Sequence, residues 1–519
     1  DAVRNATALP TESQDTRQSS HDPRLPQQAW RGRLEWTDRS QDLSWGEESE
    51  PAHIGGLRDT ATSLSKLPRC RPAGLKIGDA IRRALKEKPE IKNAIMRAIT
   101  HKLDDTSYLE RHIEALVKIV AAEVGCEDPR RGSDMGLNCE VRPYLLSAWR
   151  SFVQDPDDAP EKWFITGSPM GIRASPEDKG IFPLYSDVEA AVDPSSLATE
   201  EKGARAYAEH DHEAIAEVKT MVKRRWIKEF KSKAKAKQYV KGRLVLSKLI
   251  VIIKDKLKAG TDGKTYTKRK RRLILNLKRS GVTAASVKTE RPELPRVLDA
   301  IFAAMKLMKA QRGKKLRQIV LDFRNAFFQF PVSPAEQRFF ATRLQKSVFV
   351  WTRCVQGSRG APLICGRCLA LAMRLCFGLL PDGQGSSSTY VDDPLSTYIG
   401  TEEEQEEAMC VTTAGLLILG FDLAFDKAQD SKDGPITWTS AKLQVNHDDE
   451  SITVQVKDDI IAEVKSSVDK LLQARTIPLD ALRTLAGQAT CIASLLHAWR
   501  PFVSMIWAPL YDSKARCWW

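Results

Sequence analysis

Apolar residues recur at helical spacing in several stretches of the chain. Two such series lie between residues 76 and 125: Ile91, Ile95, Ile99 and Leu103, then Leu109, Ile113, Leu116, Val117 and Val120. This spacing puts the apolar side chains on one face of a helix, so the segment is predicted to hold amphipathic helices. Helices are predicted on similar grounds for five further ranges: 213–230, 293–310, 363–380, 458–474 and 479–499.

Shorter runs of β-branched and other apolar residues predict strands. A long hairpin is predicted over residues 244–280, with its turn at 261–264, and a second hairpin over 443–456. Helical and strand patterns therefore both occur along the chain, which predicts an α+β fold.

Two adjacent carboxylates follow a strand-like pair. Tyr390 and Val391 are strand formers, Asp392 and Asp393 come next, and a second β-rich run begins after Pro394. The pattern predicts a hairpin with the carboxylates at its tip and the proline in the turn, since proline breaks a central strand. Like charges this close repel, so such a pair is kept for a divalent cation or lies in a solvated turn.

Asp322 is the candidate partner of this pair, because it ends a short apolar strand predicted for 318–321. Carboxylates on two strands can hold two Mg²⁺ ions about 4 Å apart, the arrangement used for nucleotidyl transfer. Mg²⁺ needs few protein carboxylates and leaves its other positions to water and phosphate oxygens. Four other Asp-Asp pairs are predicted to lie in solvated turns: Asp104-Asp105, Asp157-Asp158, Asp448-Asp449 and Asp458-Asp459.

Positive charge is concentrated in one segment. The whole chain has a net charge of +13, whereas residues 221–280 alone hold 22 Lys and Arg against 3 Asp and Glu. Because β-like apolar runs interrupt this segment, it indicates a folded surface that meets phosphates; a solvated basic run is the alternative. Residues 1–65 are rich in Ser, Gln, Asp, Arg and Pro and are predicted to be disordered.

The ten cysteines are scattered, and neither a signal peptide nor an apolar run of about 18 residues is visible. These features predict an intracellular protein, cytoplasmic or nuclear, with no membrane association. Cys365 and Cys368 form a CxxC without a second pair, which favours core packing over zinc binding. The chain begins with Asp1 and is expected to be a fragment or a processed piece.

Four blocks, in order, resemble the motifs of reverse transcriptases of retrotransposon and retroviral type. They are Leu321–Gln329, Gln356–Pro362, Tyr390–Asp393, and Leu419–Phe421 followed by Lys427. The resemblance runs from about residue 222 to 512 and implies a right-hand polymerase with fingers, a palm built on an antiparallel sheet, and a helical thumb, preceded by a mostly helical N-terminal region. It divides this part into fingers and palm (221–442) and a primer-grip hairpin with thumb (443–519). Composition and periodicity predict three parts before it: a disordered tail (1–65), a helical region of unknown role (66–140) and a loop-rich lead-in (141–220).

The same resemblance implies catalytic roles. Asp322, Asp392 and Asp393 would be the metal ligands for two Mg²⁺ ions, with Mn²⁺ as a substitute. Lys427 would donate a proton to pyrophosphate or neutralise it; a surface lysine near Asp426 is the competing interpretation.

Six residues would bind the nucleotide: Arg272, Lys254, Phe327, Gln356, Gly357 and Tyr390. Lys256 competes with Lys254 for the same role, and Asn276 stands where the family usually has Asp. Phe327 would lie under the sugar and exclude a 2′-hydroxyl, although a core aromatic has the same pattern. The expected activity is that of an RNA-directed DNA polymerase acting on an RNA template, a DNA or RNA primer and dNTPs. A decayed nucleic-acid-binding relic and an RNA-dependent RNA polymerase are the alternatives.

Overall fold

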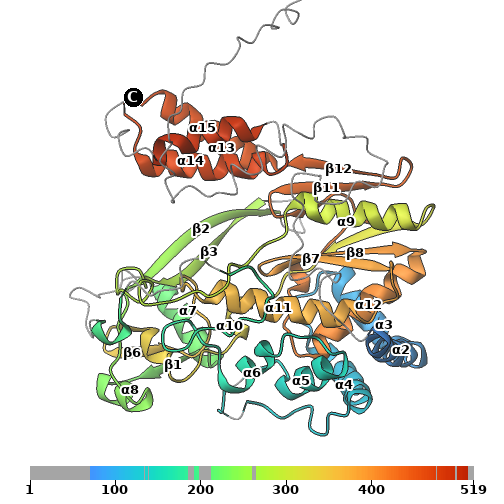
Figure 1. Cartoon of the computed structure of the whole chain (residues 1–519), viewed down its shortest axis with the longest axis horizontal. Coiled ribbons are helices and arrows are strands. Elements are labelled where there is room, and N and C mark those ends of the chain that lie inside the picture. Colours follow the sequence, from blue (N-terminus) through green and yellow to red (C-terminus); the bar gives the residue numbers. More distant parts are fainter. Residues whose placement is uncertain are drawn as a thin grey trace, which may run out of the picture.

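A computed structural model describes residues 71–511 except 134, 138, 185–191, 198–211, 260–264, 475 and 497–498. The predictions for the tail at 1–65 and for the turn at 261–264 lie outside the described residues. The remainder mixes helices with antiparallel sheets, so the predicted α+β class is confirmed (Figure 1).

Three N-terminal helices form: α2 (Arg71–Glu87), α3 (Pro89–Thr100) and α4 (Glu110–Val124). Most residues of the two predicted apolar series lie in α3 and α4, and α2 begins before the predicted segment at 76–125. Proline occupies the first turn of α3, where its missing N–H costs nothing, and α4 ends at Gly125 with φ 70°. All three contact α12 (Glu402–Ile418) and share its apolar core. The N-terminal helices are therefore part of the main body.

The central sheet is antiparallel and four-stranded, in the order β7 (Gly385–Tyr390), β8 (Asp393–Gly400), β4 (Lys315–Val320) and β9 (Gln429–Asp430). Alternate residues of β4 face opposite sides, as the strand period requires. Ile319 faces the core shared with α11 (Ala361–Phe377) and α12, whereas Val320 faces α9 (Val297–Ala310).

A second sheet covers the α9 side. It consists of β10 (Ile436–Trp438), β11 (Ala441–Asn446) and β12 (Ser451–Val456), which confirms the predicted hairpin over 443–456. The C-terminal helices follow it: α13 (Asp458–Leu472), α14 (Leu479–Ala493) and α15 (Arg500–Tyr511). They lie above the body in Figure 1.

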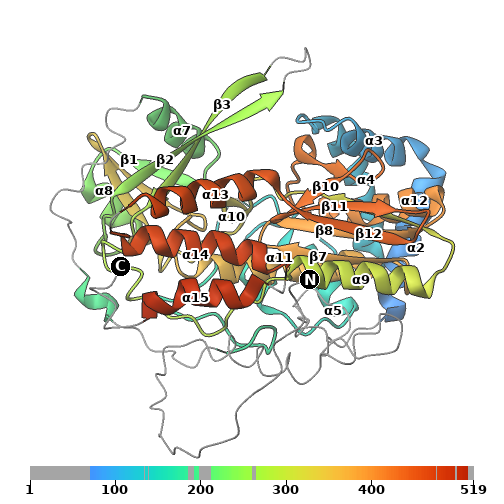
Figure 2. The same cartoon turned by 90° about the horizontal axis from the view of Figure 1, so that it is seen from above.

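The predicted basic hairpin is also confirmed. Strand β2 (Leu249–Ala259) pairs with β3 (Thr265–Leu275) along its whole length. Beside it lie α8 (Lys233–Tyr239) and a three-stranded sheet of β1 (Ile227–Phe230), β6 (Ser347–Trp351) and β5 (Ala341–Leu344). From above, these elements occupy one side of the molecule and the β10–β12 sheet the other (Figure 2).

Two predicted helix boundaries and one predicted loop-rich segment differ from the structure. The helix predicted over 213–230 ends as α7 (His212–Lys223), because Arg225 adopts φ 60° and the chain turns into β1. The helix predicted over 479–499 ends earlier, at Ala493 of α14, and α15 begins only at Arg500. The segment predicted to be loop-rich contains α5 (Pro143–Phe152) and α6 (Ala159–Thr166), each with proline in its first turn.

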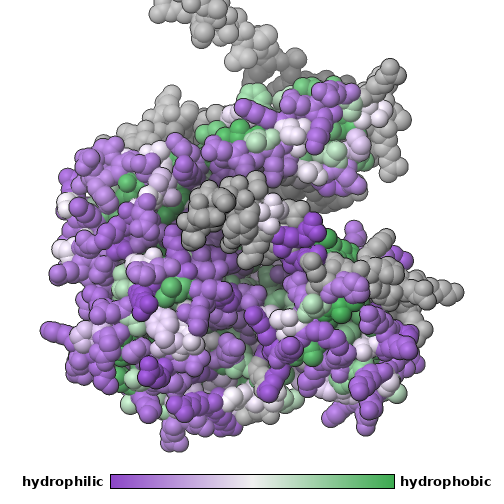
Figure 3. Space-filling view, turned by 180° about the vertical axis from the view of Figure 1, so that it is seen from behind, coloured by the Kyte–Doolittle hydropathy of each residue, from purple (hydrophilic) through white to green (hydrophobic). Residues whose placement is uncertain are grey.

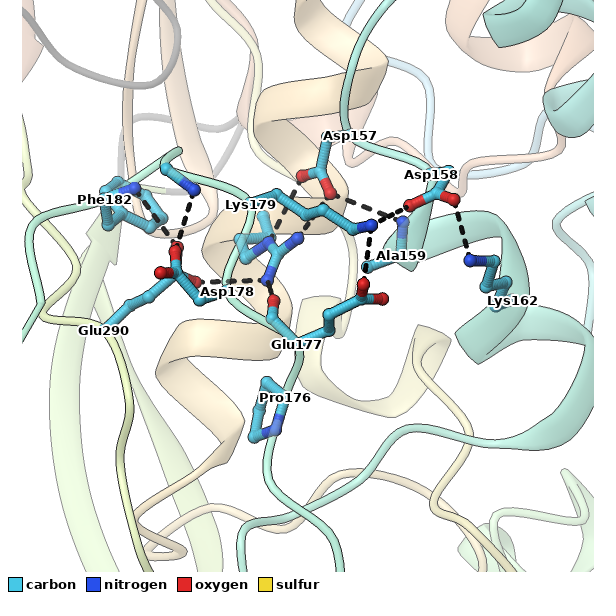
Figure 4. Close-up of polar contacts among 12 residues, drawn as sticks. Asp157, Asp158, Ala159, Lys162, Pro176, Glu177, Asp178, Lys179, Phe182 and Glu290 are labelled. Carbon is cyan, nitrogen blue, oxygen red and sulfur yellow. Dashed lines mark hydrogen bonds and ion pairs between the residues drawn. The ribbon is translucent and has the colours of Figure 1, made fainter. Parts of the chain in front are cut away.

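The prediction of a solvated turn at Asp157-Asp158 is wrong for Asp157, whose side chain is completely buried. Arg367 of α11, also buried, donates from Nε to Asp157 at 3.2 Å and from Nη1 to Glu290 at 3.1 Å. Figure 4 labels the two carboxylates, Asp157 and Glu290. Two turns further along α11, Arg374 donates to Asp155 at 2.7 Å. These ion pairs fasten the lead-in segment to α11.

Within the described residues, no helix is both long and apolar enough to cross a bilayer. The view from behind shows a mostly hydrophilic face with scattered apolar patches (Figure 3). The described cysteines are all free, and Cys365 and Cys368 are buried in α11, as core packing predicts.

Candidate active site

Two main-chain contacts bring Asp322 and Asp392 together. Leu321 N–H donates to the Pro394 carbonyl at 3.3 Å, and Phe323 N–H donates to the Asp392 carbonyl at 2.9 Å. Asp322 lies between these two donors, so the end of β4 is held against the β7–β8 turn. This is the juxtaposition predicted from the sequence.

The prediction that Pro394 lies in the turn is wrong. It is the second residue of β8, a central strand, and pairs with Thr389. Proline is tolerated here for two reasons. Its carbonyl still accepts a hydrogen bond from the Leu321 N–H, and the N–H that proline lacks would lie beyond the last residue pair of β4 and β8. The pairing of β4 with β8 ends there, and the chain leaves the sheet at Asp322.

The turn itself consists of Val391 and Asp392, closed by the pair Tyr390 and Asp393. Val391 was predicted to be in a strand, but it adopts φ 58° in this turn. A β-branched side chain rarely takes a positive φ, because its Cβ crowds the backbone. The turn thus holds local strain next to the candidate carboxylates.

Burial and mutual repulsion disfavour ionisation of the adjacent carboxylates. Burial raises the pKa of Asp392, and the nearby Asp322 raises it further. Burial raises the pKa of Asp393 to about 7, with further contributions from Asp322 and Asp392. A bound cation would relieve this repulsion, since an opposite charge favours the ionised form.

The side chain of Lys427 contacts that of Asp322. The short 3₁₀ helix η6 (Phe425–Lys427) places the lysine so that its Nζ donates to Asp322 Oδ2. Two further contacts fix this segment: Ala424 N–H donates to the Asp322 carbonyl at 2.8 Å, and Arg324 pairs with Asp426 at 3.0 Å. Lys427 therefore contacts a candidate metal ligand, while its role toward pyrophosphate stays a prediction.

Divalent cations fit the chemistry of the Asp322 and Asp392 oxygens, which are hard ligands crowded into mutual repulsion. In the part of the chain that the structure describes, however, no three His, Cys, Asp or Glu side chains converge as a metal site. Asp322 and Asp392 therefore suit an ion that takes two carboxylates and completes its coordination with water and phosphate oxygens.

The basic hairpin reaches the same place. Arg272, exposed on β3, is close enough to Asp392 to lower the pKa of its carboxyl, although burial and Asp322 outweigh this effect. Gly357 adopts φ 96° against the same strand, where a Cβ would lie 2.9 Å from Ile274 Cγ2. Gln356, half-buried, precedes it. The side chain of Lys254 lies outside the described residues; its backbone pairs with Lys270.

Two aromatic candidates remain accessible. Phe327 in α10 (Ala326–Gln329) is half-buried, whereas its neighbours Phe323, Phe328 and Phe330 are buried. Tyr390, at the end of β7, is 41% exposed. The three buried phenylalanines fill the core, and Phe327 packs against it while staying partly exposed.

Two site residues escaped the sequence analysis. Trp438 is completely buried, and its indole N–H donates to the Asp393 carbonyl at 2.9 Å, which supports the hairpin from the second sheet. Arg324 joins the two loops through Asp426 and also contacts Asp104, from the N-terminal region. A tryptophan in a β-rich stretch was the visible signal for Trp438; nothing local indicated the partners of Arg324.

Comparison with known proteins gives similarity to solved structures only. No family model and no curated protein matches the chain. A foamy viral protease-reverse transcriptase in complex with double-stranded DNA is 14% identical with a TM-score of 0.36, over 64% of this chain and 48% of that one. A second structure, of the foamy viral protease-reverse transcriptase in complex with an RNA/DNA hybrid, is 15% identical with a TM-score of 0.30. That match covers 49% of this chain and 31% of the viral one. The chain thus spans about half the length of the first of these structures.

Proposed function

We propose that the chain is an RNA-directed DNA polymerase of a retroelement, which transfers dNMP from a dNTP to a primer 3′-hydroxyl. One observation carries the proposal. Asp322 and Asp392, seventy residues apart in the sequence, meet at the end of β4 through the Phe323-to-Asp392 hydrogen bond of 2.9 Å. In this proposal, the β2–β3 hairpin belongs to the fingers, the four-stranded sheet to the palm, and α13–α15 to the thumb.

Each described residue has a task in this reaction. Asp322 and Asp392 hold divalent cations, which would supply charge stabilisation for in-line displacement at the α-phosphate. Arg272 contacts the triphosphate, for which a guanidinium fork is well suited. Gln356 and Gly357 line the nucleotide beside β3, with the glycine allowing close approach of the backbone.

The nature of the sugar depends on Phe327. An apolar ring edge cannot hydrogen-bond a 2′-hydroxyl and blocks it sterically. Phe327 is half-buried, unlike its buried neighbours, so part of its side chain remains accessible. This favours deoxynucleotides over ribonucleotides, and hence DNA synthesis over RNA synthesis.

Primer extension on poly(rA)/oligo(dT) with Mg²⁺, using dTTP or UTP, tests the proposal. We expect extension with dTTP and little with UTP. Asp392→Asn should abolish incorporation while primer–template binding, followed by fluorescence anisotropy, persists. Binding without any extension by the unaltered protein would indicate a decayed relic, and preference for UTP would indicate an RNA polymerase.

A further inference from the structure

The ammonium group of Lys427 occupies one oxygen of a candidate metal ligand. Among the ion pairs of the described residues, its contact with Asp322 is the one that reaches any of the three site aspartates. Lys427 also lowers the pKa values of Asp392 and Asp393, against the larger effects of burial and Asp322. A single lysine therefore offsets charge across the whole carboxylate group.

The lysine combines a fixed base with a mobile end. Its backbone is tied down by buried Phe425, by the Ala424 hydrogen bond to Asp322 and by the Arg324–Asp426 pair at 3.0 Å. Its side chain is nevertheless 49% exposed, compared with 21% for Asp322. The ammonium can thus leave the carboxylate without any movement of η6.

A lysine ammonium and a divalent cation compete for the same carboxylate oxygen. The ammonium is held by one charge-assisted hydrogen bond on a flexible four-carbon stem. The tethered end would stay near the site after leaving, in the region where anionic triphosphate oxygens are expected in a polymerase.

We propose that Lys427 is a tethered counterion of Asp322, which a divalent cation displaces, and which then becomes available to the phosphates of the incoming nucleotide. This inference rests on the proposed function, because it takes Asp322 as a metal ligand. It gives Lys427 two successive partners, first a carboxylate and then a phosphate.

Equilibrium Mn²⁺ binding tests the first exchange without any catalysis. The EPR signal of free Mn²⁺ is titrated against metal-free protein at about 0.15 M salt, without nucleotide or nucleic acid. We expect Lys427→Met to lower the Kd for Mn²⁺ roughly two- to fivefold, the range that one partly exposed ion pair represents. Lys427→Arg, which keeps a cation on the stem, should stay near the unaltered value.

Lys457→Met is the matched control. Lys457 acts on Asp393 through space and donates its own hydrogen bond to the Thr439 carbonyl at 2.6 Å. Its removal deletes the same charge without freeing an oxygen of Asp322, so the Kd should change less than in Lys427→Met. An equal change of the Kd for Mn²⁺ in the two variants, or an unchanged Kd in Lys427→Met, would overturn the displacement of Lys427 by the cation.

Asp322→Asn separates this inference from the proposed function. Absence of Mn²⁺ binding overturns the displacement, and binding that survives Asp322→Asn unchanged overturns the metal site and the proposed function as well. Binding that depends on Asp322 and responds to Lys427→Met supports both. Binding that depends on Asp322 but not on Lys427 overturns the counterion alone.

Discussion

The raised pKa of Asp393 makes the metal-free fold less stable as the pH rises. In the unfolded chain this carboxyl ionises near 3.8, and in the folded chain near 7. Below pH 4 both states carry the proton, so the group is neutral to stability. Between pH 4 and 7 only the unfolded state loses the proton, which progressively favours unfolding, and above 7 the full penalty remains. At about 1.36 kcal/mol per pKa unit, the penalty is at most about 4 kcal/mol.

Asp393→Asn removes the titrating group and so removes this penalty. Urea unfolding of both proteins in EDTA, at pH 4.5, 6, 7 and 8.5, gives the difference in unfolding free energy at each pH. We expect the advantage of Asp393→Asn to grow up to about pH 7 and then level off. Asp448→Asn, in the exposed β11–β12 turn, is the control for loss of one carboxylate. If the difference in unfolding free energy between Asp393→Asn and the unaltered protein stays constant with pH, or if Asp448→Asn shows the same growth, the penalty does not come from Asp393.

Three further changes have defined outcomes. Arg367→Met leaves Asp157 and Glu290 buried without their cation and should cost about 3–5 kcal/mol in urea unfolding; a loss below 1 kcal/mol would contradict a tight triad. Phe327→Val should raise incorporation of UTP relative to dTTP in primer extension, and unchanged selectivity would count against the sugar gate. Gly357→Ala forces a Cβ to within 2.9 Å of Ile274 at φ 96°, so the KM for dTTP should rise and the melting temperature fall; wild-type values for both would show that the turn tolerates a side chain.

Local patterns predicted most elements, but long-range partners were invisible in them. The helical periodicity around Ile95 and the alternation in the basic hairpin follow from neighbours in the sequence, and both elements form. The meeting of Asp322 with Asp392 was predictable only because both end strand-like runs. Asp157 was misjudged because nothing nearby indicates a buried arginine two hundred residues later.

Boundaries failed where the backbone takes conformations that residue type disfavours. Val391 and Arg225 both adopt positive φ, which a β-branched residue and a long-chain residue seldom do. Tertiary contacts impose these turns: the β8 pairing on one side, and the pairing of β1 with β6 on the other. The backbone preferences of Val391 and Arg225 alone do not predict these turns.

The docking of the N-terminal helices has a consequence for synthesis on the ribosome. Helix α2 lies so close to the end of α11 that a Cβ on Gly78 would meet the Leu379 carbonyl at 2.2 Å, and α3 and α4 pack on α12. These partners are translated only after most of the chain, on the order of ten seconds or more later at ordinary elongation rates. Until then the first helices can pack on one another, as α2 does on α4, but the faces that meet α11 and α12 have no native cover. The nascent chain therefore needs a holding chaperone, or its own transient contacts, for longer than a domain that closes on sequence neighbours.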